Sequence, residues 1–277
     1  MKIVISYISP NGTTRSISKE IGSLFINSGH EVLQFDIGRN DNRDYSQIDW
    51  SIYKDADLVG IGSPVYHLSI FDSMREYLEI ALPKIYTQNP KIKAFIFITY
   101  AGITSGRALF NTSLLLKKNN IGVVGALKLK APHFWNSNYY PEANSLELIK
   151  GFYNGLCKKD FNIIPWEKIK KIFSLRKTKV KLIYPLAGII GSRRKLPINF
   201  LETKCIKCKK CSNECPVNAI SIKEYAVRDL SKCAYCYHCT WICPKNAIEF
   251  DVEKIKSLVN LNKRIVGDEE PQNEIFV

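Results

Sequence analysis

One cysteine pattern occurs twice in this chain of 277 residues. The stretch from Cys205 to Pro216 reads CIKCKKCSNECP, and 28 positions later the stretch from Cys233 to Pro244 reads CAYCYHCTWICP. Both have the form C-x2-C-x2-C-x3-C-P, so eight of the nine cysteines fall within 39 residues. Because disulfide scaffolds are usually short secreted chains, the clustering predicts metal ligation in a reducing compartment. The ninth cysteine, Cys157, is assigned no role.

The spacing suits an iron–sulfur cluster better than a zinc ion. A cubane cluster needs four thiolates around one compact core. Cysteines three positions apart on a tightly looped backbone supply three of them, while backbone N–H groups point at the sulfurs. Zinc ribbons use two C-x2-C pairs and require neither a third cysteine nor a following proline. Zinc is the alternative, and the doubled pattern favours iron.

On these motifs the C-terminal segment resembles a bacterial-type ferredoxin with two 4Fe-4S clusters, over about 50 residues. In such proteins the fourth cysteine of each copy ligates the other cluster. The resemblance therefore implies two mixed ligand sets: Cys205, Cys208, Cys211 and Cys243 for one cluster, and Cys233, Cys236, Cys239 and Cys215 for the other. The ring-bearing side chains between the ligands are interpreted as packing residues: Tyr235, Tyr237, His238 and Trp241.

The first 160 residues alternate between apolar runs and helical patterns. Apolar or β-branched runs, typical of strands buried on both faces, cover 2–8, 56–64, 92–100 and 121–130, and 31–35 also reads as a strand. Apolar positions at helical spacing cover 14–28, 71–82, 106–119 and 143–158. Strands alternating with single helices indicate a parallel sheet covered on both faces. Five strands in about 160 residues fit the flavodoxin-like doubly wound order 2-1-3-4-5.

The loop after the first predicted strand reads SPNGTT, from Ser9 to Thr14. It lies where a strand ends, a helix begins and the strand order reverses, which is where such sheets bind ligands. Small hydroxyl and amide side chains with Gly12 let the backbone wrap an oxyanion, and the helix N-terminus adds N–H donors. The loop suits a phosphate monoester, although a hydroxyl-rich helix cap is the alternative. The P-loop sequence G-x-x-x-x-G-K-S/T is absent.

This loop is similar to the FMN phosphate loop of flavodoxins, T/S-x-T-G-x-T, with Asn11 in place of the middle threonine. Three further loops fit the same edge: GSPVYH (62–67), with Tyr66 as a plate for a flavin ring, TYAGITSGRA (99–108), with two glycines for close backbone approach, and APHFWNSNYYP (131–141). The resemblance implies an FMN site formed by Ser9, Asn11, Gly12, Thr13, Thr14, Ser63, Pro64, Val65, Tyr66, Thr99, Tyr100, Gly102 and Gly106.

The formal net charge of +14 is concentrated in one segment. Residues 158–204 carry 13 basic and 3 acidic side chains, whereas the segments before and after carry net charges of only +3 and +1. We favour a solvated strap between two domains. The alternatives are an amphipathic helix on an anionic membrane surface and, less favoured, nonspecific nucleic-acid binding. The apolar side chains between these charges are Trp166, Ile169, Ile172, Phe173 and Leu175.

We expect four parts: a flavodoxin-like FMN-binding domain at 1–160, a basic bridge at 161–200, a ferredoxin-like domain at 201–250, and a helix with an acidic tail at 251–277. The helical pattern covers 252–261, and the tail GDEEPQNEIFV is expected to fray. Neither MKIVISYISP nor LIYPLAGII fits an export signal or a membrane span, so we expect a cytoplasmic protein.

The whole chain resembles the flavodoxin–ferredoxin fusion electron-transfer proteins of anaerobic bacteria and archaea, over about three-quarters of its length. The resemblance implies a relay between two 4Fe-4S clusters and FMN, with no catalytic residue. The alternatives are an FMN-dependent reductase of a small substrate such as a quinone, fed by the clusters, and a redox-sensing module that binds nucleic acid through the bridge. Free-standing flavodoxins are acidic and this domain is not. We expect a redox partner, a ferredoxin or an oxidoreductase, with an acidic docking surface.

Overall fold

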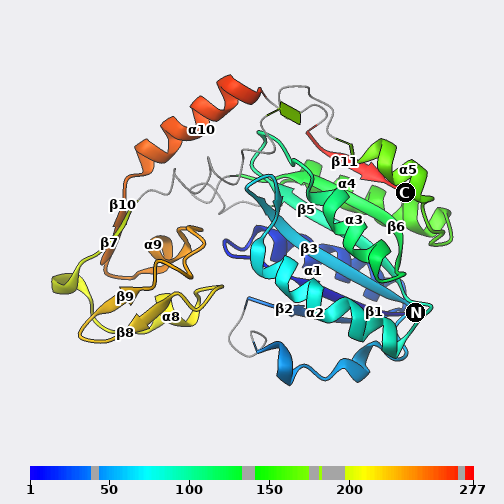
Figure 1. The fold of residues 1–277 in the computed structure, drawn as a ribbon, viewed down its shortest axis with the longest axis horizontal. Helices are drawn as coiled ribbons and strands as arrows, with labels where there is room; N and C mark the ends of the chain where they lie inside the picture. The colour runs from blue at the N-terminus through cyan, green and yellow to red at the C-terminus, as the bar shows by residue number, and fades with distance from the viewer. Residues whose placement is uncertain (39–43, 133–140, 175–180, 183–196, 268–271) are drawn as a thin grey trace.

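The computed structural model describes residues 1–38, 44–132, 141–174, 181–182, 197–267 and 272–277. Most of the loop at 131–141 and much of the bridge lie outside these residues. Figure 1 shows two units: a larger one built on a sheet between layers of helices, and a smaller one of short strands and helical turns. The bridge and the long helix α10 connect them in sequence.

Five parallel strands form the centre of the larger unit: β1 (Lys2–Tyr7), β2 (Glu31–Asp36), β3 (Leu58–Tyr66), β5 (Lys93–Tyr100) and β6 (Gly122–Lys130). Their order across the sheet is β6-β5-β3-β1-β2. Numbered one to five along the chain, this is the order 2-1-3-4-5, so the predicted flavodoxin-like topology is confirmed. A two-residue strand, β4 (Ser69–Ile70), turns back onto the end of β3.

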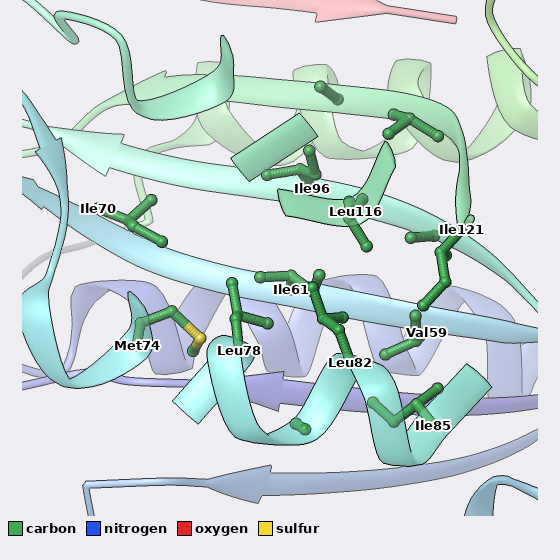
Figure 2. Close-up of a cluster of buried hydrophobic side chains, with 14 of the residues drawn as sticks. Val59, Ile61, Ile70, Met74, Leu78, Leu82, Ile85, Ile96, Leu116 and Ile121 are labelled. Atoms are coloured by element: carbon green, nitrogen blue, oxygen red, sulfur yellow. The ribbon is translucent and has the colours of Figure 1, made fainter. Parts of the chain in front are cut away.

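Helices cover both faces of the sheet, as predicted. On one face α1 (Thr13–Asn27) and α4 (Ala143–Lys158) bury apolar side chains against β1, β3, β5 and β6. On the other face lie α2 (Asp72–Gln88) and α3 (Ala108–Lys118). Figure 2 shows Met74, Leu78, Leu82 and Ile85 of α2 lying over Val59 and Ile61 of β3. Two short 3-10 turns, Tyr45–Gln47 and Trp50–Tyr53, precede β3.

Helix α2 is longer than the sequence indicated. The predicted pattern stopped at Leu82, directly before Pro83, whereas the helix continues to Gln88. Proline removes one helical hydrogen bond. Ile85, only 1% exposed, lies beyond it in the core. The burial of this side chain favours continuing the helix, because a buried aliphatic side chain contributes about 1.5–3 kcal/mol.

The C-terminal tail corrects two predictions. Residues 274–276, expected to fray, form β11 (Glu274–Phe276), which pairs antiparallel with β6 at the edge of the sheet. Among the described residues, β11 and β4 bring the sheet to seven strands, two more than the five predicted. The Glu274 carboxylate forms an ion pair with Lys128, and the Tyr100 hydroxyl donates a hydrogen bond to the Gln272 carbonyl at 2.6 Å. These contacts stabilise a segment whose acidic composition had suggested a loose end.

The first part of the bridge packs against the larger unit, whereas its last residues form β7 (Ile198–Phe200) of the smaller unit. Helix α5 (Trp166–Ile172) buries Ile169. Phe173, the residue after the end of α5, meets Phe276 edge-on with ring centres 5.0 Å apart. Lys117 lies 4.3 Å from the centre of the Trp166 ring. These apolar side chains, which a membrane-binding helix would expose, contact the protein instead; Leu175 lies outside the described residues. Within the described part of the chain, none of the helices combines the length and apolar character needed to cross a bilayer.

The smaller unit has an internal two-fold repeat. β7 (Ile198–Phe200) pairs with β10 (Ile248–Phe250), and β8 (Ile220–Ile222) pairs with β9 (Ala226–Arg228). The short helices α8 (Lys210–Asn213) and α9 (His238–Ile242) start 28 positions apart, like the cysteine motifs. A 3-10 turn at Glu202–Lys204 precedes the first motif.

Helix α10 (Val252–Val266) follows β10 and is longer than the predicted 252–261. The Asp251 side chain caps it by accepting a hydrogen bond from the Lys254 N–H at 2.8 Å. In Figure 1 this helix rises from the smaller unit toward the side of the molecule where β11 joins the sheet. The chain therefore leaves the larger unit after α5 and returns to it at its C-terminus.

Candidate functional site

The two cysteine loops share an unusual backbone conformation. Lys207 and Lys209 have φ angles of 56° and 62°, and their counterparts Tyr235 and Tyr237 have 53° and 59°. Residues other than glycine seldom adopt this left-handed conformation. Alternating it with right-handed residues turns successive N–H groups toward the inside of a loop, where they can face an anion.

Backbone N–H groups point at several cysteine sulfurs. Ala219 N donates to Cys215 Sγ at 3.3 Å, and 28 positions later Ala247 N donates to Cys243 Sγ at 3.2 Å. Tyr235 N donates to Cys233 Sγ at 3.4 Å. Hydrogen bonds of this kind stabilise thiolates and tune the potential of an iron–sulfur cluster.

The eight cysteines surround two small cavities of about 20 Å³ each. We call them the first chamber, lined by Cys205, Cys208, Cys211 and Cys243, and the second chamber, lined by Cys215, Cys233, Cys236 and Cys239. Each chamber takes three cysteines from one motif and the fourth from the other, which is the grouping that the ferredoxin resemblance implies. Among the described residues, no three His, Cys, Asp or Glu side chains converge closely enough to hold a single metal ion. The thiolates of a four-iron cluster, by contrast, bind separate irons around a larger core.

Burial raises the pKa of thiols in both chambers. It raises the pKa of Cys211 to about 11, with further contributions from Cys208 and Cys243. It raises the pKa of Cys236 to about 12, with further contributions from Cys215 and Cys233. Free thiols with such pKa values keep their protons at neutral pH. Because the thiolate is the metal ligand, iron binding must release these protons.

A larger cavity, of about 250 Å³, lies at the carboxyl edge of the sheet, between the two units. We call it the edge pocket. Seven of the thirteen residues expected at an FMN site line it: Asn11, Thr13, Pro64, Val65, Tyr66, Thr99 and Tyr100. Ala101, Ala131 and Pro132 also line it and belong to two of the loops expected at this edge, whereas four further lining residues were not expected from the sequence: Tyr235, Tyr237, Ile255 and Val259.

The loop from Ser9 to Thr14 has a conformation that suits a ligand. Gly12 has a φ of 86°, and a Cβ added there would meet no atom within 4 Å. Gly12 occupies the N-cap position of α1 and has no side chain to bond the first N–H groups of the helix. The Ser9 hydroxyl accepts a hydrogen bond from one of these groups, Arg15 N, at 2.9 Å. The first N–H groups of a helix have no partner within it. In the first turn of α1 the Arg15 N–H is bonded to Ser9, so the Thr13 and Thr14 N–H groups are the natural donors to a bound anion.

Several predicted site residues serve the packing of the loops. The Thr14 and Thr99 hydroxyls, both buried, hydrogen-bond to each other at 2.9 Å, and the Ser63 hydroxyl accepts from Phe71 N at 3.0 Å. At Gly106 an added Cβ would lie 2.3 Å from the Leu68 carbonyl oxygen. In the described structure Ser9, Gly12, Thr14, Ser63, Gly102 and Gly106 do not line the edge pocket.

Tyr66 and Asn11 lie where the edge pocket meets the second chamber. Asn11 Nδ2 donates to the Tyr66 hydroxyl at 3.5 Å and to the Cys236 carbonyl oxygen at 3.4 Å. The Tyr66 ring meets Phe71 at 90° with centres 5.0 Å apart. Burial raises the pKa of Tyr66 far above its ordinary value, with the nearby Cys236 thiol as the next cause. The pocket and the chamber therefore share a wall.

The residues missed by the sequence analysis come from the smaller unit and α10. Ile255 and Val259 are four positions apart and lie on one face of a helix. This spacing predicts an apolar face, but it does not indicate which surface that face packs against. Tyr235 and Tyr237 were interpreted as packing residues. Tyr237 does pack, on Phe250 with ring centres 5.1 Å apart, and it also lines the pocket. Trp241 is 53% exposed, so packing explains it only in part.

A second cavity between the units, of about 500 Å³, lies beside Tyr66 and Cys233. The aromatic and acidic side chains of its lining come from the larger unit, and the smaller unit contributes small apolar, amide, hydroxyl and lysine side chains. Its other lining residues are Tyr45, His67, Phe71, Asp72, Ser73, Glu76, Pro216, Val217, Asn218, Ser231, Lys232 and Ala234. This cavity could admit a small molecule close to Tyr66.

A family model described as a 4Fe-4S dicluster domain matches residues 204–257. No curated protein matches the chain. Similar solved structures include a flavodoxin from the Archaea (16% identity, 57% of this chain and 98% of that chain, TM-score 0.44). Another is flavodoxin 1 from Bacillus cereus (17% identity, 57% of this chain and 98% of that chain, TM-score 0.42). A third is the rubredoxin oxygen:oxidoreductase from Desulfovibrio gigas (20% identity, 57% of this chain and 36% of that chain, TM-score 0.42).

The order of the five parallel strands defines a flavodoxin-like fold, and the family match defines an iron–sulfur domain of the dicluster type. The chain is a fusion of the two. Its two domains meet at the carboxyl edge of the sheet.

Proposed function

We propose that this protein is an electron-transfer iron–sulfur flavoprotein, which relays electrons between FMN and two 4Fe-4S clusters. One observation carries the proposal: the edge pocket is lined both by the predicted flavin loops and by Tyr235 and Tyr237, which flank Cys236 in the second chamber. A flavin in this pocket and a cluster in this chamber would be separated by a single layer of residues. The eight thiols and the dicluster match suit a reducing cytoplasm.

The residues present fit FMN. The first turn of α1, after Gly12, would hold the phosphate through backbone N–H groups. Tyr66, Thr99 and Tyr100, at the carboxyl ends of β3 and β5, would flank the flavin ring. Flavins exchange one or two electrons, whereas each cubane cluster exchanges one. The fold would supply the position of the ring, and the apolar α10 side chains Ile255 and Val259 would help exclude water from it.

The residues present also fit two clusters. Each chamber combines four cysteines with N–H groups directed at sulfur, and the fourth cysteine of each comes from the other motif. The second chamber is the one that contacts the edge pocket, through Cys236 and its neighbours. We therefore assign it to the cluster that exchanges electrons with the flavin. The first chamber would hold the other cluster, which would exchange electrons with the cluster in the second chamber.

Anaerobic purification with iron, zinc and flavin assays tests this proposal. We expect about eight irons and one FMN per chain. Cys236→Ser should lower the iron content, whereas Cys157→Ser, outside both motifs, should leave it unchanged. In rapid mixing, reduced clusters should reduce the flavin within the same molecule. Tightly bound zinc in place of iron, or a purified protein that binds no FMN, would contradict the proposal.

A second candidate function has its own observation. The 500 Å³ cavity beside Tyr66 could bring a small acceptor, such as a quinone, close to the flavin, so the protein would be an FMN-dependent reductase fed by the clusters. Turnover of a quinone with a reduced ferredoxin as electron donor tests it. Filling the cavity by Ser73→Trp should then abolish turnover while leaving the flavin bound.

A further inference from the structure

Corresponding positions of the two cysteine loops have opposite surroundings. In the second loop, Tyr235 and Tyr237 face the edge pocket. The positions 28 residues earlier are Lys207 and Lys209, with the same left-handed backbone. The two loops therefore have similar shapes and different side chains. One loop contacts the larger unit through aromatic rings, and its counterpart carries ammonium groups.

The first loop lies on the surface. Residues 206–210 are all exposed, including the Cys208 residue itself, whereas its counterpart Cys236 is partly covered. Ile206, in the same loop, is 55% exposed. Lys245 lines the first chamber from the other motif and is exposed as well. The first chamber is therefore the one that a second protein can approach closely.

The charge of this surface is positive. Lys207 has only a distant carboxylate, Glu224 at 3.8 Å, and both side chains are more than half exposed. Among the described residues, no carboxylate lies within 4.0 Å of the Nζ atoms of Lys209, Lys210 or Lys245. An apolar side chain within a rim of lysines is typical of a protein docking surface that selects an acidic partner.

We propose that residues 206–210 together with Lys245, the lysine loop, form the docking surface for a small acidic ferredoxin. The inference rests on the proposed function, since it requires a cluster in the first chamber. One electron would leave the reduced cluster of the ferredoxin, which is oxidised, and reduce the cluster in the first chamber. No bond forms or breaks, and no proton is required. The second motif would then pass the electron toward the edge pocket.

A charge-reversal pair tests this inference on the full-length protein with its cofactors. The first variant combines Lys207→Glu, Lys209→Glu and Lys210→Glu. The matched control combines Lys54→Glu, Lys91→Glu and Lys118→Glu, which are exposed, lie at the amino edge of the sheet, and change the net charge equally. The probe is a purified acidic bacterial ferredoxin with two clusters, and association is measured over a range of salt concentrations.

We expect the lysine-loop variant to associate about tenfold more slowly at low salt and to lose most of its salt dependence, because charge complementarity acts mainly on association. The control should stay within about twofold of the wild type. Equal losses in both variants would show that the net charge alone attracts the ferredoxin, and would overturn the inference. The inference would also be overturned if the wild-type protein did not bind the ferredoxin at low salt, or if duplex DNA displaced the ferredoxin from the wild-type protein.

Carbodiimide cross-linking gives a second readout that is independent of electron transfer. We expect the ferredoxin carboxylates to link to Lys207, Lys209, Lys210 or Lys245, and not to Lys54 or Lys91. Iron and FMN contents are measured on every preparation. A wild type that lacks iron or FMN contradicts the proposed function, whereas a fully loaded wild type that forms cross-links elsewhere contradicts only the docking surface.

Discussion

The side-chain amide of Asn11 lies 3.4 Å from the main-chain carbonyl oxygen of Cys236, a residue 225 positions away. The same amide lies 3.5 Å from the Tyr66 hydroxyl. A shorter side chain at this position, such as threonine, would keep its hydroxyl closer to the backbone. Asn11 therefore gives the loop after β1 a donor that reaches the cysteine loop of the other domain.

We predict that Asn11→Ala slows electron transfer between the second cluster and the flavin, while iron and FMN contents stay at wild-type levels. Both hydrogen bonds are long, so the loss of unfolding free energy should be at most about 1 kcal/mol. Rapid-mixing measurements of flavin reduction check this. Asn162→Ala, at an exposed position, is the matched control. A wild-type transfer rate in Asn11→Ala would show that this contact does not set the distance between the domains.

The mixed composition of the chambers predicts which cysteine variants behave alike. Cys205→Ala and Cys243→Ala come from different motifs but line one chamber, so both should lose the same cluster and retain about four of eight irons. Cys215→Ala and Cys233→Ala should lose the other cluster. Electron paramagnetic resonance of the reduced variants distinguishes the two residual clusters. If Cys243→Ala matched Cys233→Ala instead, each motif would hold its own cluster.

The sequence predicted the five parallel strands because four of them are mostly apolar runs and β2 alternates with them between helical patterns, and these patterns need no information about distant residues. The resemblance to bacterial ferredoxins implied the two mixed cysteine sets, and the same sets line the two chambers. The sequence did not predict β11. Three residues, Glu274 to Phe276, are too few for a periodic signal, and their pairing depends on the edge of β6.

The sequence also did not predict that the edge pocket and the second chamber share a wall. Tyr235 and Lys207 occupy equivalent positions, and the local pattern does not say which of the two loops faces the other domain. That orientation depends on how the two units pack, which involves contacts such as Asn11 with Cys236. Ile255 of α10 lines the pocket for the same reason. Contacts between domains are set by tertiary packing, whereas strands and loops carry local signals.

The ion pair between Lys128 and Glu274 predicts a large effect of a single substitution. Lys128 is only 1% exposed, and its ammonium group lies 5.6 Å from the centre of the Tyr100 ring. Glu274→Ala removes a carboxylate from a buried ammonium group and should lower the unfolding free energy by about 3 kcal/mol. Lys128→Met combined with Glu274→Leu should recover most of this loss, because apolar groups then replace both charges. Urea unfolding measures both variants.

The outcome also reports on the position of β11. If Glu274→Ala costs less than about 1 kcal/mol, the pair behaves as an exposed one and the C-terminal strand does not depend on it. Glu253→Ala is the control, since its ion pair with Lys256 is largely exposed. We expect that substitution to change the unfolding free energy by less than about 0.5 kcal/mol.

Three hydroxyl groups in the core make the stability of the protein sensitive to alkaline pH. The Ser6, Tyr53 and Tyr77 hydroxyls lie 3.0 to 3.1 Å from one another. Burial raises the pKa of both tyrosines above the ordinary value of 10, and for Tyr77 the neighbouring Tyr53 adds to the rise. Above pH 10 the unfolded chain therefore releases protons that the folded core keeps. Stability is fully present below pH 10 and falls as the pH rises further.

Tyr77→Phe removes one of these two titrating groups. We expect it to cost about 1 kcal/mol at neutral pH and to make the loss of stability above pH 10 shallower, by about 1.4 kcal/mol per pH unit. Ser6→Ala should cost a similar amount at neutral pH without changing that slope, because it removes a hydroxyl group that does not titrate. Urea unfolding from pH 8 to pH 11 measures both quantities. An unchanged slope in Tyr77→Phe would mean that Tyr77 is able to ionise within the folded core.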